Sequence, residues 1–250
     1  DFYNIKKTFK IVRIPCLDFV SFDIANIGFF ISATSFLIFT KIYLFFKKYD
    51  VLYSREQLTG IFFRNSILEV HALPQGIGYF RKYLLNRAKE VVVLTSFLKN
   101  ILTKSGIAAN KILVLPDAVD MEEFDIDISK EAAREKLELP LDKKIILYTG
   151  SFLSYEWKGV DVLLESAKIL SGDYLFVLVG GHPWELDQIR KRWGLKNVKL
   201  VSYVKHNFIP YYLKAADILV LPNKSGNEAS ELYTSPLKLF EYMASRRPIV

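Results

Sequence analysis

Lysines beside glycine-containing turns are the residues whose types and spacing best suit phosphate binding. Gly150 and Ser151 close an apolar run, and Lys158 with Gly159 opens a stretch of helical periodicity. An ammonium group near the free amides of a helix N-terminus favours an anion and suits a diphosphate. A Lys-Gly pair before a helix is a weak signal by itself, so a purely structural turn stays an alternative.

A second candidate cluster lies close to the C-terminal end of the sequence. Thr234 and Ser235 precede Pro236, which predicts a helix cap whose free backbone amides could hold phosphate. Lys238 and Glu241 are three residues apart and can share one helix face. The Glu241 carboxylate could accept two hydrogen bonds from ribose hydroxyls. The alternative is an exposed ion pair worth a few tenths of a kcal/mol.

The first half offers a carboxylate and an imidazole at the end of an apolar run. Glu69 and His71 are two residues apart, so on a strand they share a face and can meet the same ligand. Arg55 follows another apolar run. His71 is the histidine best placed for proton or hydroxyl contacts, although a lone histidine is more often structural.

The second half of the chain alternates short apolar runs with helix-like stretches. The runs are uninterrupted, which is typical of parallel strands covered on both faces. Strand–helix–strand repeats at this spacing predict a doubly wound α/β sheet, whose ligands bind beyond the carboxyl ends of the strands, where Gly150 and Gly180 lie. The predicted strands are 144–150, 174–181, 198–201, 218–222 and 248–250, and the predicted helices are 160–170, 184–193, 209–217 and 236–245.

The first half repeats this pattern less regularly. A helix at 96–106 is predicted to begin at a Thr95 or Ser96 cap and to stop at Gly106. The predicted strands are 51–54, 67–73, 91–95 and 112–116.

A change of charge marks the boundary between the halves. Residues 1–116 carry 16 basic and 7 acidic side chains, whereas residues 117–140 carry 3 and 9. We therefore predict two Rossmann-like domains, at 1–120 and 141–250, joined by a linker at 121–140, with a ligand cleft between them.

Composition excludes several classes of protein. Hydrophobic residues make up 51% of the chain, which excludes a disordered polymer. The single cysteine, Cys16, excludes an intramolecular disulfide framework, and with three histidines it leaves too few ligands for a structural zinc site. The basic residues are scattered and no nucleic-acid module is recognisable, so we expect no nucleic-acid partner.

One segment raises the question of a membrane. Residues 24–40 contain no charge and are followed by Lys41 and further apolar residues. A buried helix of an α/β layer is the preferred interpretation. A helix lying in the bilayer interface, with Lys47 and Lys48 at its end, and a true membrane span are the alternatives.

The most specific signal is a series of motifs spread over essentially the whole chain. They are DVLYSR (50–55), EVHALP (69–74), VVVLTSFLKNIL (91–102), NKILVLPDAVDMEEF (110–124), LYTGSFLSYEWKGVDVLLESAKIL (147–170) and SPLKLFEYMASRRPIV (235–250). In this order they resemble retaining glycosyltransferases of the GT-B fold, and more narrowly family four, the glycosyltransferase group 1 enzymes. The resemblance implies an α/β protein whose two Rossmann-like domains, both incomplete in this chain, face a cleft.

The resemblance also implies an activity. Such an enzyme is a hexosyltransferase-type transferase that moves a sugar from a nucleotide diphosphate sugar to a glycan or lipid-linked acceptor with retention of configuration. The family works without a metal or other cofactor, because cationic side chains and helix dipoles stabilise the departing diphosphate.

The resemblance assigns roles by position. Lys158 would contact the diphosphate with Ser235 near its oxygens, Glu241 would bind the ribose, and His71 would face the donor sugar. The resulting predictions are His71, Lys158 and Glu241 as catalytic residues; Gly150, Ser151, Lys158, Gly180, Tyr203, Val204, Ser235, Lys238 and Glu241 as donor-binding residues, with Tyr203 and Val204 at the base; and Arg55, Glu69 and His71 on the acceptor side.

Three positions depart from the family pattern. A second glutamate, eight positions before Glu241, is replaced by Tyr233. The arginine that often follows the strand-ending glycine is Ser151. A glycine near the end is Arg246, where a left-handed backbone would cost about 1 kcal/mol.

The ends of the chain affect the expected activity. The sequence starts at Asp1 and stops at Val250 inside a predicted strand. Compared with the family it would lack an N-terminal loop and the final helices, so we expect this fragment alone to be inactive.

Three other functions fit the same motifs. A non-catalytic nucleotide-sugar-binding homologue suits the departures, and a GT-B-fold epimerase would release nucleotide without an acceptor. A membrane protein with an accessory Rossmann module would require a spanning segment. The basic first half and the apolar segment fit a cytoplasmic enzyme of polysaccharide biosynthesis, resting on an anionic inner membrane face.

Overall fold

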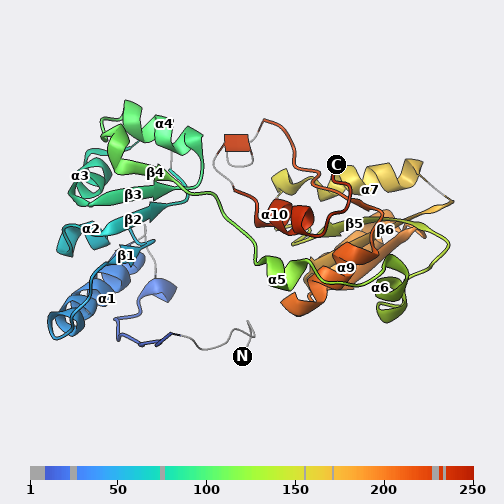
Figure 1. Ribbon diagram of the computed structural model, residues 1–250, viewed down its shortest axis with the longest axis horizontal. Helices are drawn as coiled ribbons and strands as arrows, with labels where there is room; N and C mark the ends of the chain where they lie inside the picture. The colour runs from blue at the N-terminus through green and yellow to red at the C-terminus, as the bar shows by residue number, and fades with distance from the viewer. Residues whose placement is uncertain are drawn as a thin grey trace. The chain divides into compact units, whose positions relative to one another are not determined.

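The computed structural model contains two compact units, each built on its own parallel sheet (Figure 1). It describes residues 9–22, 27–73, 77–154, 156–170, 172–226, 231–232 and 235–250. The described residues up to Pro116, with Leu232, form the first unit. Asp117–Glu231 and Ser235–Val250 form the second unit. The two parallel sheets confirm the predicted α/β fold class.

The sheet of the second unit has the strand order β7-β6-β5-β8, and every strand pair is parallel. Ile249 adds an isolated parallel bridge to Leu219 where the sequence predicted a fifth strand. The strands are β5 (Lys144–Thr149), β6 (Tyr174–Gly181), β7 (Val198–Ser202) and β8 (Ile218–Leu219). The helices and 3-10 turns are α5 (Met121–Phe124), α6 (Lys130–Lys136), η3 (Glu156–Lys158), α7 (Val160–Ile169), α8 (Pro183–Trp193), η4 (His206–Phe208), α9 (Ile209–Ala215) and α10 (Leu237–Ala244).

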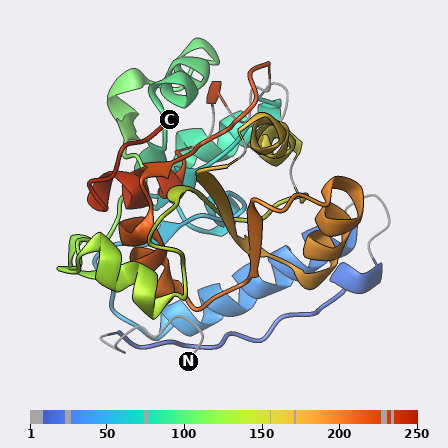
Figure 2. The same cartoon turned by 90° about the vertical axis from the view of Figure 1, so that its right-hand side faces the viewer.

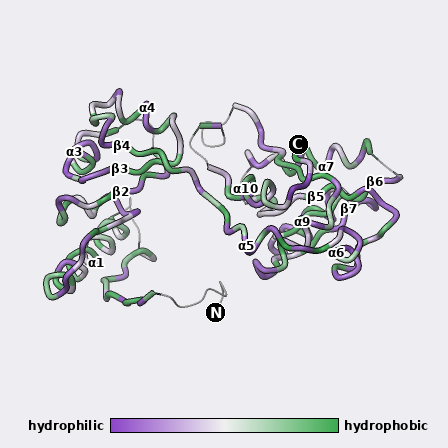
Figure 3. Tube along the Cα trace, viewed as in Figure 1, coloured by the Kyte–Doolittle hydropathy of each residue, from purple (hydrophilic) through white to green (hydrophobic). Residues whose placement is uncertain are grey.

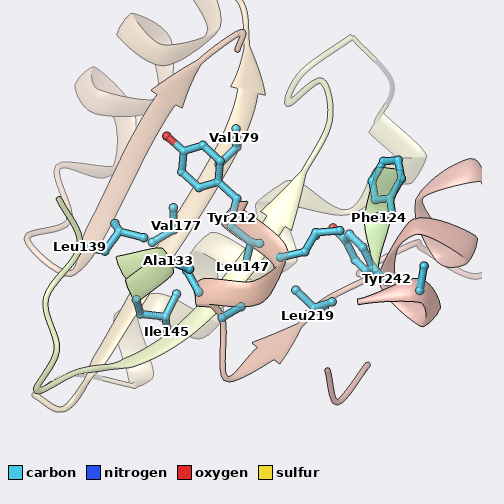
Figure 4. Close-up of a cluster of buried hydrophobic side chains, with 14 residues drawn as sticks. Phe124, Ala133, Leu139, Ile145, Leu147, Val177, Val179, Tyr212, Leu219 and Tyr242 are labelled. Carbon is cyan, nitrogen blue, oxygen red and sulfur yellow. The ribbon is translucent and has the colours of Figure 1, made fainter. Parts of the chain in front are cut away.

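Both faces of this sheet are buried, because helices pack against each of them. Successive side chains of a strand point to opposite faces and therefore enter two different cores. Ile145 and Leu147 of β5 belong to one core with residues of α9 and α10 (Figure 4). Ile146 and Tyr148 belong to a second core with residues of α7 and α8. Unbroken apolar strands, visible in the hydropathy of the trace in Figure 3, are therefore the expected pattern here.

The acidic segment 121–140 is part of the second unit rather than a free linker. It forms α5 and α6, and its Phe124 and Ala133 lie in the core of the second unit. The charge change therefore marks the start of a folded segment. The glutamates of these two short helices are exposed while Phe124 and Ala133 are buried, a pattern that net charge alone does not reveal.

The first unit has four parallel strands in sequential order. Its core joins strand residues such as Val70 and Val91 to Leu98 and Leu102 of α4. Thr95 caps α4, as predicted, by accepting a hydrogen bond from the Leu98 amide at 3.2 Å. The elements are η1 (Val20–Phe22), α1 (Ile27–Phe45), β1 (Tyr53–Ser54), α2 (Thr59–Phe62), β2 (Ile67–Val70), α3 (Tyr79–Arg87), β3 (Glu90–Val93), α4 (Ser96–Lys104), η2 (Ala109–Lys111) and β4 (Ile112–Val114).

Helix α1 corrects the preferred interpretation of the apolar segment. Its buried residues lie on two opposite sides of the helix, with Gly28, Ser32 and Ser35 on one side and Leu37 on the other, while its phenylalanines and isoleucines are exposed. The two serine hydroxyls accept amide hydrogen bonds at 2.9 Å from the extended segment 9–19, which runs alongside the helix (Figure 2). The prediction of a buried helix assumed that the apolar side chains would face the protein. Helix α1 is long and apolar enough to cross a membrane, but a single helix with these properties is weak evidence of a membrane span.

Candidate active site

A pocket of about 240 Å³ lies at the carboxyl edge of the second unit's sheet. Seven of the predicted donor-binding residues line it: Gly150, Ser151, Gly180, Tyr203, Val204, Lys238 and Glu241. Four lining residues were not predicted as site residues: Thr149, Val179, His206 and Ile209. The ends of strands β5 and β6 and the start of α10 thus bring together polar groups that the sequence separates by up to 92 positions, from Thr149 to Glu241.

The backbone at this edge needs a glycine at Gly180. Its φ of +112° lies in a region that side chains disfavour, and an added Cβ would lie 3.1 Å from the carbonyl oxygen of Gly150. The glycine therefore lets the turns after β5 and β6 pack closely. Close packing of the backbone is therefore a sufficient reason for a glycine at position 180, and contact with a ligand is not needed to explain it.

Lys158 reaches the pocket from the turn that precedes α7. Its Nζ donates a hydrogen bond to Ser151 Oγ at 2.6 Å. Burial lowers the pKa of Lys158, and the negative charge of Glu185 partly opposes that shift. The following Gly159 has a φ of +67°, and an added Cβ would lie 1.7 Å from the carbonyl oxygen of Pro222. The Lys-Gly pair thus combines a packing requirement with a cation beside the pocket.

A buried carboxylate that the sequence analysis missed holds the loop carrying Ser151. Glu185 is fully buried and accepts hydrogen bonds from the amides of Leu153 at 2.6 Å, Ser154 at 3.1 Å and His182 at 2.8 Å. Burial raises the pKa of Glu185, but these hydrogen bonds outweigh burial and lower it. Glu185 is the third residue of α8 and accepts the amide of the N-cap residue His182, as the glutamate of a capping box does. The signal in the sequence is a glutamate two residues after Pro183, the proline at the start of the helix.

Lys238 has an unusual environment. Its Nζ is shielded from solvent and has no hydrogen-bond partner among the residues that the structure describes. The Nζ lies 4.1 Å from the ring centroid of Tyr148. Burial, together with the charge of Lys158, lowers the pKa of Lys238 to about 7, against an opposing effect of Glu241. The predicted alternative of an exposed Lys238–Glu241 ion pair is wrong for the described residues.

Glu241 is engaged by a histidine instead. Its side chain is 17% exposed, and its Oε1 lies 3.4 Å from His206 Nε2. The other ring nitrogen of His206 lies 3.0 Å from Glu123 Oε1. Burial raises the pKa of Glu241, whereas His206 and Lys238 act in the opposite direction. One carboxylate oxygen has this imidazole contact, which leaves the carboxylate able to accept hydrogen bonds from a ligand.

Ser235 does not cap α10. Pro236 occupies the N-cap position, with no side-chain cap hydrogen bond, and the buried Ser235 Oγ accepts a hydrogen bond from the Asp117 amide at 2.9 Å. The hydroxyl is therefore used within the fold, and Ser235 is not among the pocket-lining residues. Tyr233 and Thr234 lie outside the described residues.

Arg246 adopts the left-handed conformation that the sequence analysis considered for it. Its φ is +58°, and its guanidinium pairs with Asp125. This ion pair gives the side chain a structural contact at a position that glycine would occupy with less strain.

In the first unit, the three predicted acceptor-side residues meet at the end of β1 and β2. His71 Nε2 contacts Glu69, and Arg55 lies 3.1 Å from His71 Nδ1. Tyr53, which was not predicted, donates its hydroxyl hydrogen to Glu69, and burial with this hydrogen bond raises the pKa of Tyr53 to about 12. Tyr53 belongs to the apolar run that Arg55 follows and lies two residues before it. Because residues two apart on a strand share a face, this spacing could have indicated that Tyr53 belongs to the same cluster. The catalytic role of His71 stays a prediction.

Comparison with known proteins gives the context of the pocket. Residues 143–250 match the sequence profile of a family described as "Glycosyl transferases group 1". The match is confined to these residues, of which all that the structure describes except Leu232 lie in the second unit. The match begins at β5 and includes every residue that lines the pocket.

Similarity to curated proteins agrees with the family match of residues 143–250. The chain is 28% identical over 170 residues to the putative colanic acid biosynthesis glycosyl transferase WcaI of Escherichia coli, a match that covers 66% of this chain and 40% of that protein. It is 26% identical over 178 residues to the alpha-D-kanosaminyltransferase of Streptomyces kanamyceticus, covering 68% of this chain and 44% of that relative. The chain thus matches less than half the length of these relatives.

Solved structures show the same GT-B fold. Sucrose-phosphate synthase from Thermosynechococcus elongatus superposes with a TM-score of 0.68 at 22% identity, covering 91% of this chain and 62% of that one. HepE of Anabaena, solved in complex with UDP, superposes with a TM-score of 0.67 at 17% identity, covering 87% and 63%. At these identities the likeness shows the fold alone.

Proposed function

We propose that the chain supplies the nucleotide-sugar site of a glycosyltransferase that moves a sugar, with retained configuration, from a nucleotide diphosphate sugar to an acceptor. The observation that carries the proposal is the pocket at the carboxyl edge of the second unit's sheet. Lys238 and Glu241 line this pocket, and Lys158 donates a hydrogen bond to the lining residue Ser151. The likeness in fold to a protein solved with UDP supports the same class of ligand.

The two lysines supply the electrostatics that the departure of a diphosphate requires. A cation about 4 Å from a phosphate oxygen gains about 4 kcal/mol at an effective dielectric constant of about 20, more than an exposed ion pair contributes. A preorganised cation stabilises charge that develops in the transition state without reorganising solvent. We therefore propose metal-independent transfer, which predicts that added EDTA leaves turnover unchanged.

Glu241 gives the site its preference for a nucleoside. In this proposal its carboxylate accepts hydrogen bonds from the ribose hydroxyls, while His206 holds one oxygen in place. Tyr203 and Val204 line the same pocket and would lie against the base. A ribose missing its hydroxyls would leave a half-buried carboxylate without partners and bind more weakly.

Nucleotide binding tests the proposal. Thermal unfolding of the 250-residue chain is measured with UDP, GDP and ADP, on the unmodified chain, Glu241→Ala and the exposed control Glu165→Ala. A ligand at about 100 times its Kd stabilises by about 2.7 kcal/mol. We expect one nucleotide to raise Tm, the control to keep the rise and Glu241→Ala to lose most of it. A cooperative transition that no nucleotide shifts would overturn the proposal in favour of a non-binding homologue.

The stereochemistry and the reaction class need a second experiment. Because the 250-residue chain alone is expected to be inactive, a protein that contains it within the full length of its curated relatives is used. This protein is incubated with the nucleotide sugar of the selected base and a simple glycoside acceptor, and the anomeric signals of the product are followed by NMR. Retention predicts the donor's anomeric configuration in the product. Release of nucleotide with an epimerised free sugar and no acceptor dependence would support the epimerase interpretation, which the comparisons do not favour.

Helix α1 supports a second, separate proposal, peripheral contact with an anionic membrane. Its exposed side includes Phe36, Phe39 and Phe45, and Lys47 and Lys48 follow its end. Apolar side chains beside lysines favour an interface with anionic lipid. Sedimentation with phosphatidylserine vesicles at low salt is expected to carry the chain down. Equal binding to neutral vesicles, or none to either, would reject the contact.

A further inference from the structure

We propose that Lys238 is a second diphosphate-binding cation of the pocket and that it takes up one proton from solvent when the nucleotide diphosphate binds. The inference rests on the proposed function, since it concerns the same ligand. It adds a step that the binding proposal does not require, because a site whose lysines are already charged would bind the same nucleotide without changing its protonation.

The position of Lys238 places it against the turn that receives the ligand. A Cβ added at Gly150 would lie 3.5 Å from Lys238 Nζ, an ordinary contact distance, so the amine lies directly beside the Gly150 backbone. On the next residue, Ser151 Oγ accepts the hydrogen bond of Lys158. Two lysines that come from different elements, η3 and α10, therefore flank the same Gly150–Ser151 turn.

The surroundings of the amine do not support a permanent charge. Its Nζ has no solvent contact and no hydrogen-bond partner in the described part of the chain, only the face of the Tyr148 ring. An isolated buried ammonium is expensive, and such a group usually releases its proton instead. The lowered pKa of Lys238, about 7, agrees with this geometry.

The charged groups around the amine act on its protonation in opposite directions. Lys158 on η3 repels a proton on Lys238, and Glu241 on the same helix attracts one. Glu241 is itself shared with His206 of η4, and Glu185 of α8 acts on Lys158 and on the Tyr148 ring of β5. The neighbouring side chains thus leave the protonation of Lys238 to be decided by burial and by whatever occupies the pocket.

A nucleoside diphosphate changes that balance. It brings about three negative charges when its terminal phosphate is fully ionised. Beside these charges the ammonium form of Lys238 is favoured, so the pKa of the amine moves back toward its ordinary value. The proton comes from water or buffer and returns there when the nucleotide leaves, so no covalent bond other than N–H changes.

Calorimetry counts the proton directly. UDP is titrated into the 250-residue chain at about pH 8 in buffers of different ionisation enthalpy, and the slope of observed enthalpy against ionisation enthalpy gives the protons taken up. A lysine with a pKa near 7 is about nine-tenths neutral at this pH, so we expect uptake of about 0.9 proton. GDP and ADP are titrated in the same way. The unmodified chain suffices, so the test does not depend on a variant that folds.

Two variants identify the group. Lys238→Met is expected to bind the nucleotide with at least tenfold weaker affinity and with uptake near zero. Lys168→Met, which removes an exposed lysine of α7, is expected to keep both the affinity and the uptake. Tight binding with no proton uptake by the unmodified chain overturns the inference and leaves the proposed function standing. Uptake that persists in Lys238→Met also overturns it, and absence of binding by all three nucleotides overturns both.

Discussion

The two edges of the second unit's sheet use the same kinds of charged residue in opposite ways. At the amino edge, Asp217 precedes β8 and its carboxylate is held by Arg134 Nη2 at 2.6 Å, Lys130 Nζ at 2.9 Å and the Ile145 amide at 2.7 Å. Burial raises the pKa of Asp217, but these partners outweigh burial and lower it. The carboxylate is therefore ionised and fully partnered within the fold.

Arg134 completes the amino edge. It is buried, and besides Asp217 it donates to the carbonyl oxygens of Ala215, Leu141 and Lys143. At the carboxyl edge, by contrast, Lys238 has no hydrogen-bond partner among the described residues. Charges that the fold satisfies stabilise it, whereas a charge that the fold leaves unsatisfied lowers stability and is available to a ligand.

Breaking the satisfied edge should have the largest effect. Asp217→Ala leaves the buried guanidinium of Arg134 without its carboxylate, and removing one partner of a buried pair costs about 3–5 kcal/mol. We expect a loss of this size in the free energy of unfolding in urea. The exposed pair of Asp187 with Arg190 provides the control, since Asp187→Ala should cost less than about 1 kcal/mol. Similar losses of unfolding free energy in Asp217→Ala and Asp187→Ala would contradict the claim that the Asp217 carboxylate stabilises the amino edge more than an exposed pair does.

At the carboxyl edge, removing the amine of Lys238 should raise the free energy of unfolding instead of lowering it. Lys238→Met removes a buried amine that ionises at a cost, so the free chain should gain about 1–3 kcal/mol at neutral pH. Above a pH of about 7 the folded chain holds fewer protons on this lysine than the unfolded chain does. The unmodified chain therefore gains stability as pH rises toward about 10, and the advantage of Lys238→Met shrinks. Urea denaturation at several pH values measures this, and a variant that is less stable at every pH would refute it.

Glu185 combines features of both edges. Its carboxylate is fully hydrogen-bonded, as that of Asp217 is, but it holds the loop that carries the pocket residue Ser151. Glu185→Gln replaces an acceptor-only carboxylate with an amide that cannot accept from all of its donors, Leu153, Ser154 and His182. We expect a loss of about 1–3 kcal/mol in stability together with weaker UDP binding, since the loop carrying Ser151 loosens. Loss of stability with unchanged UDP affinity would show that the loop does not position the pocket.

The pH dependence of nucleotide affinity should show the smallest effect. Because Lys238 must be protonated in the complex, the Kd for UDP should rise with pH from about 7 toward about 9, by at most tenfold per pH unit, or about 1.4 kcal/mol. Below about pH 7 this contribution is constant. Titrations at several pH values test it, with Lys238→Met expected to give a flat profile over the same range.

The sequence predicted the elements and the pocket better than it predicted the environment of each group. Apolar runs located the strands and the alternation of elements predicted a doubly wound sheet, so Gly150 and Gly180 were expected at one edge. Glu241 was assigned to the same ligand by the family resemblance. Periodicity reports where apolar residues recur but not what they face, which is why the exposed side of α1 was mistaken for a buried one.

The burial of individual polar groups could not be read in the same way. Glu185 and Lys238 look alike in sequence, as charged residues near the start of a helix, yet the first has four hydrogen bonds and the second has none among the described residues. The difference depends on side chains from other elements. The same reason explains Ser235, whose hydroxyl binds the Asp117 amide rather than capping its own helix.

The double variant Lys158→Met/Lys238→Met tests most directly whether the carboxyl edge keeps its cations for a ligand. Its thermal unfolding is measured with and without UDP, beside that of the unmodified chain. Our account predicts that without nucleotide the variant unfolds at the same temperature or higher, and that UDP no longer raises it. A variant that unfolds well below the unmodified chain, or one that UDP still stabilises fully, would contradict the account.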